Sequence, residues 1–333
     1  MYDLLLNADE TMIADSVQAF LEDRLPLSRL RPAAAVLDRN TGWQDLARLG
    51  WLGTGLPERS GGSGLGLVEE VLIQRGCGAH LVTPNVLATC LAGHIALAAD
   101  DLQLAARFAH GEAQASLAIA SPAGRGRAFI LDREGSEYAV TWGGWGSGLF
   151  DLAAAKPEPC GESIDDSITL CAIDFDPGDA IHLVGDVSLK WRAELLLAAA
   201  QVGLATAACD LAVGYAAIRE QFGKPIGSFQ AIKHRAADMA VRQRLAWYQT
   251  CLAALKWQSG ADDAELQVAS ALLLASEAAR ENGRACIQIH GGIGFQAECD
   301  AHWFVKRALV YDLAGGGEQC QTGRILSAPE PAW

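Results

Sequence analysis

Two glycine-containing segments carry residue types that suit a phosphate-bearing ligand. The first, HGGIGF, spans His290–Phe295 and lies between two helical stretches. Three glycines within four residues allow backbone amides to approach an anion, and a helix that starts there would add partial positive charge. No strand precedes the segment and no Gly-Lys-Ser/Thr follows it, so it is neither a Rossmann fingerprint nor a P-loop. Its alternative interpretation is a structural turn between helices.

The second segment, REQFGKPIGSFQ, spans Arg219–Gln230 and joins two long helices. Arg219 offers a planar, bidentate donor to a pyrophosphate, although an arginine at a helix C-terminus also complements the helix dipole. Phe222 can present a flat apolar surface to an aromatic ring. Gln230 can hydrogen-bond a purine edge or a phosphate. Each residue alone has an ordinary structural explanation, so the segment indicates a ligand site only in combination with other motifs.

The elements around these segments divide the chain into three predicted domains. Residues 1–111 have a helical pattern, which begins with a first helix capped by Asn7 or Asp9. Residues 112–189 contain short alternating runs between Gly, Pro and Asp clusters, which predict a small β domain. Residues 190–333 return to long, nearly Pro-free helices and predict a helical bundle. The fold class is therefore mainly α with a small β domain, because a doubly wound fold would alternate strands and helices throughout.

Composition narrows the classes of partner. The net charge of −14 argues against nucleic acid, and a phosphate-bearing ligand would need a local cluster of Arg or Lys. Nine cysteines without CxxC spacing give no metal signature, and their odd number favours a reducing compartment. The N-terminus lacks the pattern of a signal peptide, and no run of about 18 uncharged apolar residues predicts a membrane span. We therefore expect a cytoplasmic protein.

Three motifs in the same order resemble the acyl-CoA dehydrogenase family. The stretch REQFGKPIGSFQAIKHRAADMA, from Arg219, is similar to that family's bundle motif. QIHGGIGFQAECDAHWFVKRA, from Gln288, is similar to its Gln-x-x-Gly-Gly-x-Gly motif, and LGWLGTGLPERSGGSGLGLVEE, from Leu49, is similar to a segment between early helices. The resemblance covers most of the chain. It implies an N-terminal helical domain, a middle β domain and a C-terminal helical bundle.

The resemblance also implies a cofactor, partners and a reaction. FAD would bind at a subunit interface of a homo- or hetero-oligomer, and the reaction would be α,β-desaturation of an acyl-CoA thioester. An electron-transfer protein would reoxidise the flavin. By their positions in the motifs, Arg219, Phe222 and Gln230 would reach the pyrophosphate or adenine of a neighbouring subunit's flavin. Gln288, Gly291 and Gly292 would hold its adenosine diphosphate part.

The chain departs from the family at the catalytic base. The family places its glutamate either in a loop near the C-terminus, where this chain aligns Ala314 or Gly315, or early in the helix before Arg219, where it aligns Ala193. Glu194 is one residue away from the second position and is the candidate catalytic base. The alternative is a first-turn glutamate that faces the helix dipole. Asp312 and Glu318 lie near the first position and have the alternative interpretation of solvated loop acids.

The predicted β domain departs from the family as well. AIASPAG, from Ala118 to Gly124, only loosely resembles the family's Thr-Glu-Pro stretch that borders the flavin ring. WGGWG, from Trp142 to Gly146, does not give the expected flavin contacts. Some bacterial members of the family, similar to enzymes that act on steroid or other bulky acyl-CoA side chains, pair one base-bearing chain with a related chain. This sequence fits such a related chain. The competing hypothesis is a scaffold or regulatory protein of the same fold that binds no flavin.

Overall fold

A computed structural model describes residues 2–31, 42–121, 126–153, 155–159 and 162–328. The chain divides into two compact units, each made of segments distant in sequence. One, the helical unit, comprises Met1–Val36, Gln74–Leu81 and Leu197–Trp333, and the other, the mixed unit, comprises Leu37–Ile73 and Val82–Leu196. The division at residues 111 and 189 remains a prediction.

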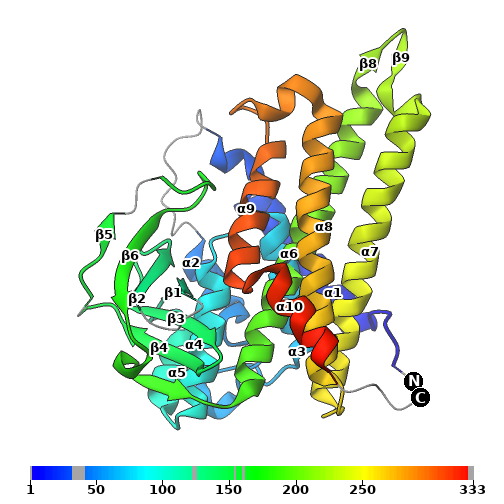
Figure 1. Cartoon of the computed structure of the whole chain (residues 1–333). Helices are drawn as coiled ribbons and strands as arrows, with labels where there is room; N and C mark the ends of the chain where they lie inside the picture. The colour runs from blue at the N-terminus through cyan, green and yellow to red at the C-terminus, as the bar shows by residue number, and fades with distance from the viewer. Residues whose placement is uncertain (1, 32–41, 122–125, 154, 160–161, 329–333) are drawn as a thin grey trace. The chain divides into compact units, whose positions relative to one another are not determined.

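The helical unit is built on long helices with a hairpin at one end. Its first helix, α1, begins where Asn7 and Glu10 cap each other: the Asn7 side chain accepts from the Glu10 amide and the Glu10 carboxylate accepts from the Asn7 amide. Helix α8 packs against α7, α9 and α10, and Figure 1 shows α7 and α8 side by side. The elements are α1 (Ala8–Arg24), η1 (Leu27–Leu30), α6 (Val187–Ile218, which starts in the mixed unit), β8 (Glu220–Gln221), β9 (Lys224–Pro225), η5 (Ile226–Ser228), α7 (Gln230–Gln258), α8 (Ala264–His290), η6 (Gly291–Phe295), α9 (Ala301–Ala314) and α10 (Gly317–Ser327).

Two glycines allow α3 (Leu67–Ala79), which contributes to both units, to cross α6 at backbone distance within the helical unit. A Cβ on Gly78 would lie 1.9 Å from the Ala200 carbonyl oxygen, and one on Gly203 would lie 2.0 Å from that of Arg75. No side chain fits at either position, so the two helices pack with their backbones in contact.

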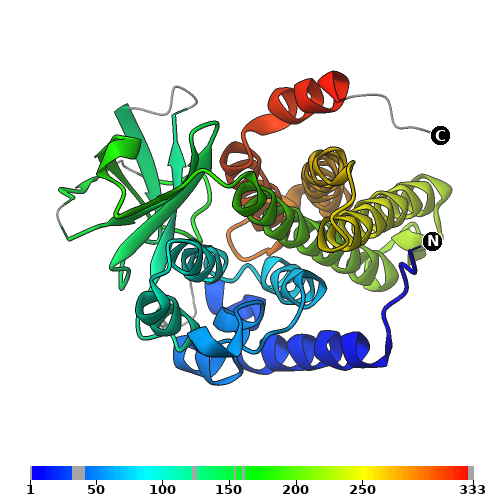
Figure 2. The ribbon, with the colours of Figure 1, turned by 90° about the horizontal axis from the view of Figure 1, so that it is seen from below.

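The mixed unit combines short helices with a sheet. Helix α4 packs against strands β1, β3, β4 and β7, and Figure 2 shows it as the cyan helix beside the sheet. The helices of this unit, besides the first part of α3 and the start of α6, are α2 (Trp43–Arg48), η2 (Trp51–Gly53), η3 (Glu58–Ser60), α4 (Asn85–Ala98), α5 (Leu102–Ala109) and η4 (Pro177–Asp179).

Seven strands of the described residues form one sheet in the order β5-β6-β2-β1-β3-β4-β7. Strands β1 and β3 pair in parallel, with Ala115 opposite Tyr138, and all other neighbours pair antiparallel. Its core includes Ile130, Phe150 and Phe175. The strands are β1 (Ala115–Ala120), β2 (Gly126–Leu131), β3 (Tyr138–Gly143), β4 (Gly146–Asp151), β5 (Glu158–Pro159), β6 (Leu170–Phe175) and β7 (His182–Val184).

The predicted fold class is confirmed, and one local expectation is wrong. Tyr311–Glu318 was expected to be a loop, but α9 extends to Ala314 and α10 starts at Gly317. Helix α6 meets the length and hydropathy criteria for a membrane span, with a mean hydropathy of 1.7 over 18 residues. That window is 72% buried inside the protein, which is typical of a central core helix.

Candidate functional site

The segment from Arg219 to Gln230 forms a tight β-hairpin at the end of α6. Glu220 pairs with Pro225 and Gln221 with Lys224, which leaves a two-residue turn. Both turn residues have positive φ, +55° at Phe222 and +77° at Gly223, as a type I′ turn requires. A phenylalanine rarely occupies this region, because its Cβ crowds the backbone there.

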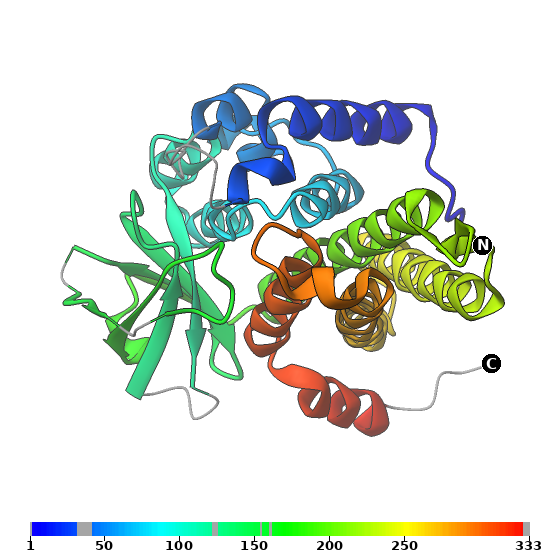
Figure 3. The ribbon, with the colours of Figure 1, turned by 90° about the horizontal axis from the view of Figure 1, so that it is seen from above.

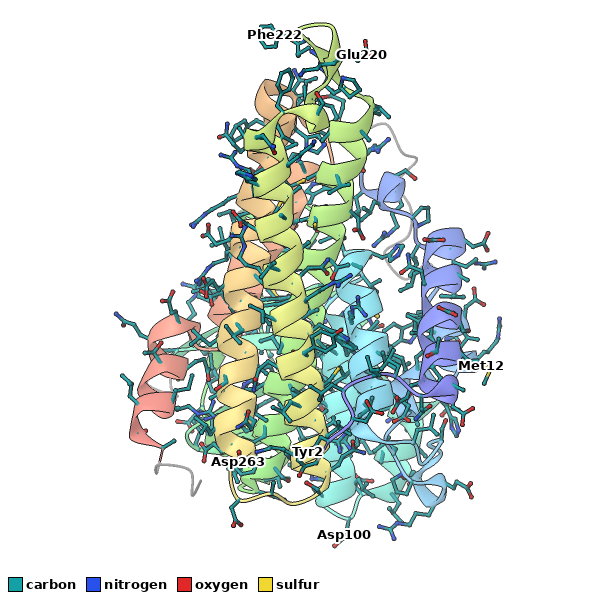
Figure 4. The ribbon with its side chains drawn as sticks, turned by 90° about the vertical axis from the view of Figure 1, so that its right-hand side faces the viewer. Tyr2, Met12, Asp100, Glu220, Phe222 and Asp263 are labelled. Carbon is teal, nitrogen blue, oxygen red and sulfur yellow. The ribbon has the colours of Figure 1, made fainter. Side chains whose placement is uncertain are left out.

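The Phe222 side chain projects from the tip of the hairpin. It is 92% exposed, and Figure 4 shows it, with Glu220, at the end of the helical unit. Its ring meets that of Phe229 edge to face at 6.1 Å, and the Lys224 ammonium lies 4.5 Å from the centre of the Phe229 ring. Phe222 is thus an aromatic surface that the described part of this chain leaves open to a partner or ligand.

The glycine motif begins where α8 ends. Gly291 adopts φ +64°, and its amide donates to carbonyls of the last turn of α8. Only the short 3-10 helix η6 starts at Gly291, and the next α-helix, α9, starts at Ala301, so the motif lies at no α-helix N-terminus. The helix dipole therefore does not favour an anion at the motif. A Cβ on Gly291 or Gly292 would meet no atom within 4 Å, so open space surrounds both residues.

A stacked pair of rings brings the two motifs to the same end of the helical unit. The Tyr215 ring, one turn before Arg219 on α6, lies 4.2 Å from the His290 ring at an interplanar angle of 21°. Viewed from above in Figure 3, the hairpin (yellow-green) and the turn after α8 (orange) both lie at the near end of this unit. Arg219, Phe222, Gly291 and the residues beside them thus form one set, which we call the open end: Arg219, Phe222, Gln230, Gln288, Gly291 and Gly292.

The segment that carries Arg219 is basic in an acidic protein. Residues 219–244 contain six Lys or Arg and two acids, whereas the whole chain carries a net charge of −14. Arg219, Gln230 and Gln288 are exposed, and their side chains make no hydrogen bond or ion pair with any residue that the structure describes. This is the local cluster that a phosphate-bearing ligand needs.

The open end fits the adenosine diphosphate part of FAD. A diphosphate needs unpartnered cationic or polar donors, which Arg219, Gln230 and Gln288 supply, and a surface without side chains, which Gly291 and Gly292 supply. An adenine needs a flat apolar neighbour, for which the exposed Phe222 ring is suited.

Glu194 lies deep in the mixed unit rather than in a first helical turn. Helix α6 starts at Val187, so Glu194 is two turns in and the alternative interpretation of a dipole-facing glutamate is wrong. Its side chain is 2% exposed, and its Oε1 lies 3.9 Å from the Lys190 ammonium. The neighbouring Ala193 is fully buried.

A buried ionic cluster in the same unit includes Arg192, two residues before Glu194 on α6. Glu70 of α3 binds the Arg192 guanidinium, and its other oxygen lies 2.7 Å from His94 Nε2 of α4. Burial raises the pKa of Glu70, but the charges and hydrogen bonds of Arg192 and His94 outweigh burial and bring that pKa to about 2. Burial, together with Arg192, lowers the pKa of His94. A Cβ on Gly55 would lie 2.5 Å from the Glu70 carboxylate, so the cluster also requires a glycine there.

The C-terminal position of the family's base offers no free acid. A Cβ on Gly315 would lie 3.1 Å from Leu272 and 3.3 Å from Leu197, so its surroundings are apolar. Asp312 and Glu318, expected to be solvated loop acids, both bind Arg280, at 2.9 and 3.0 Å.

The two β-domain segments do not form an exposed surface for a flavin ring among the described residues. Trp145 packs against Phe150 and Phe175, with ring centres 6.5 and 5.8 Å apart, so its ring belongs to the core of the sheet. In the AIASPAG segment, Ala118 to Ala120 belong to β1, Ser121 follows the strand, and residues 122–124 lie outside the described residues.

Sequence reasoning missed the Glu70 cluster and the Tyr215–His290 stack. The members of each lie on different helices, 122 residues apart for Glu70 and Arg192. The only available signal was charge inside otherwise apolar helical stretches, such as Glu70 and Arg192, and it does not name the partner.

Family models match both ends of the chain. The N-terminal domain of acyl-CoA dehydrogenases matches residues 7–106, and the C-terminal domain of acyl-CoA dehydrogenases matches residues 192–328. The region between them includes most of the sheet.

Individual relatives agree with the family models. Acyl-CoA dehydrogenase IpdE2 of Mycolicibacterium smegmatis is 32% identical over 253 residues, which are 76% of this chain and 76% of that protein. FadE34 of Mycobacterium tuberculosis is 31% identical over 317 residues, and the match covers 86% of this chain but 43% of FadE34. The ChsE4–ChsE5 complex of Mycobacterium tuberculosis has a TM-score of 0.82 at 20% identity, covering 98% of this chain and 100% of that one, which shows a shared fold. The chain belongs to the acyl-CoA dehydrogenase family, whose members are FAD-dependent oxidoreductases.

Proposed function

We propose that this chain is a subunit of an FAD-dependent acyl-CoA dehydrogenase that desaturates an acyl-CoA thioester and works with a related chain. The observation that carries the proposal is the open end: donors without partners, two glycines facing open space and an exposed aromatic ring, all at one end of the helical unit. Arg219, Phe222, Gln230, Gln288, Gly291 and Gly292 would hold the adenosine diphosphate part of FAD.

The exposure of these residues favours a site completed across an interface. A cofactor held within one chain would normally be enclosed by that chain's own side chains. Here Phe222 is 92% exposed and stands at the tip of a hairpin, a position suited to reaching a neighbouring chain. The related fold of ChsE4–ChsE5 was solved as a complex of two chains, which supports a heteromer.

The source of the catalytic base distinguishes two forms of this proposal. Ala193 and the Ala314–Gly315 pair cannot take a proton, and Asp312 and Glu318 are bound by Arg280. Glu194 is the carboxylate that this chain offers near a family position, and a glutamate of the related chain is the alternative. In either form the base removes the α-proton of the thioester. FAD, when bound, would supply the acceptor for the hydride that leaves the β-carbon. An electron-transfer protein would reoxidise the flavin.

The test of the cofactor role is the flavin content of the purified full chain. We expect the visible absorbance of oxidised flavin, and we expect Arg219→Ala to weaken FAD binding about 10- to 100-fold, because a hydrogen bond to a charged phosphate is lost. Arg59→Ala is the control, since Arg59 is also exposed, lies outside the basic segment 219–244 and makes no described ion pair. A colourless protein that takes up no FAD, even when co-expressed with a related chain, would favour the scaffold hypothesis instead.

The test of the base is Glu194→Gln, measured as turnover of an acyl-CoA series that includes steroid-type thioesters. A fall of about 100-fold or more with FAD content unchanged identifies Glu194 as the base. Unchanged turnover assigns the base to the related chain. Glu277→Gln is the control, because Glu277 is exposed on α8, makes no described ion pair and lies outside both family positions and the glycine motif.

A further inference from the structure

The His290 imidazole has a fixed tautomer when neutral. Its Nδ1 lies 2.8 Å from the carbonyl oxygen of Cys286, one turn earlier on α8. A carbonyl only accepts, so Nδ1 must be the donor. The Cys286 thiol lies 3.7 Å from the same nitrogen, and burial raises the pKa of that thiol to about 12, so it remains protonated. Nε2 of the neutral ring is consequently an acceptor.

Nε2 has no partner within the described part of the chain. The residue is 7% exposed, and no hydrogen bond of Nε2 is found among the described residues. Among the described residues, His80 Nδ1 is an example of a buried side-chain atom without a hydrogen-bond partner, but His290 Nε2 is not among such buried atoms. The small exposed part of the side chain therefore includes Nε2, which presents its lone pair at the surface.

The ring is held in place at the open end. Tyr215 stacks on one face at 4.2 Å, and the Cys286 carbonyl fixes one edge. Gly291 and Gly292 follow directly and add no side chain that could cover the ring. The Nε2 lone pair, on a ring held in place beside two glycines, can accept a hydrogen bond from a donor group of a ligand. Arg219, by contrast, is suited to binding phosphates.

We propose that His290 is a further ligand-binding residue, whose Nε2 accepts a hydrogen bond from the adenosine half of FAD. This inference rests on the proposed function. Adenosine has two kinds of donor that an acceptor can recognise, the adenine amino group and the ribose hydroxyls. The phosphates carry only acceptor oxygens, so they cannot donate a hydrogen bond to this nitrogen.

The test compares FAD with FMN, which lacks the adenosine, in titrations of the full chain as purified. His290→Phe keeps a ring to stack on Tyr215 but removes the acceptor. We expect it to raise the dissociation constant for FAD roughly 3- to 10-fold, as for one neutral hydrogen bond, and to leave that for FMN unchanged. Tyr215→Phe is the control, because it keeps the stack and His290 and should bind FAD as the wild type does.

Two analogues identify the donor. Flavin hypoxanthine dinucleotide lacks the amino group, and FAD with a 2′-deoxyadenosine lacks a ribose hydroxyl. The analogue that lacks the recognised donor should bind the wild type more weakly than FAD does but bind His290→Phe as FAD does. Equal FAD affinity in the wild type and His290→Phe overturns the role of His290 alone. A wild-type chain that binds no FAD overturns the proposed function as well.

Discussion

The Glu70 cluster and the open end place polar groups in opposite circumstances. Glu70 and His94 are buried, the Arg192 side chain is largely withdrawn from water, and the Glu70 carboxylate accepts hydrogen bonds from both of the others. At the open end, Arg219, Gln230 and Gln288 are in water and bind no described residue. Polar groups that satisfy each other stabilise a fold, whereas polar groups left unpartnered beside bare glycines are available to a ligand.

The largest effect should follow from breaking the buried cluster. Glu70→Gln removes the buried negative charge that pairs with Arg192 and His94. We expect the free energy of unfolding to fall by about 3–5 kcal/mol. Urea titration of the full chain measures this. Glu69→Gln, next to it on α3 but half-buried and without a described ion pair, should change stability by less than about 0.5 kcal/mol. Equal stability of Glu70→Gln and the wild type would contradict a stabilising role for the cluster.

Acid should produce a slightly smaller effect through the same carboxylate. The pKa of Glu70 is lowered from 4.5 to about 2 in the folded chain, so its contribution is present above pH 4.5 and is lost as the pH falls through 2. That contribution is about 3 kcal/mol. His94, whose pKa is also lowered, adds to the loss below its ordinary value of 6.5.

Unfolding free energies measured from pH 7 to pH 2 should therefore fall more steeply for the wild type than for Glu70→Gln below pH 4.5. Parallel curves for the two proteins would show that Glu70 titrates normally.

The smallest expected change in unfolding free energy is at the hairpin, where one substitution should affect stability and FAD binding in opposite directions. Phe222→Asn places a residue that tolerates positive φ in a type I′ turn, so we expect a gain of about 1 kcal/mol or less in unfolding free energy. The same change removes the exposed ring and should weaken FAD binding. Leu326→Asn, at a side chain on α10 that is 81% exposed, should change neither quantity. A destabilised Phe222→Asn would show that the ring stabilises the hairpin more than its backbone strains it.

Periodicity and capping predicted most of the helices, because these signals are local. The apolar spacing marked α7 and α8, and a cap at Asn7 or Asp9 marked the start of α1, where the structure has Asn7. Strand β1 was harder, since ASLAIA lacks alternation and is rich in alanine, and the glycines around Trp145 concealed the start of β4. The glycines after Ala314 suggested a loop, although α10 starts within them.

The candidate site was predictable only as far as its motifs extend. The sequence named Arg219 and Gly291 as members of separate motifs, and the Tyr215–His290 stack is what relates the two within the structure. The tautomer of His290 depends on the Cys286 carbonyl, and no residue pattern reports such a contact. The assignments of Arg219, Phe222, Gln230, Gln288, Gly291, Gly292 and Glu194 remain predictions.

The basic segment at residues 219–244 gives the chain an uneven distribution of charge. With six cations against two acids there and a net charge of −14 overall, the remaining surface is strongly negative. A dianionic nucleotide approaching by diffusion is repelled from most of the molecule and attracted to one end of it. Its rate of association should therefore depend on which part of the chain it approaches. Higher ionic strength should reduce this preference, because salt screens both the repulsion and the attraction over about 10 Å.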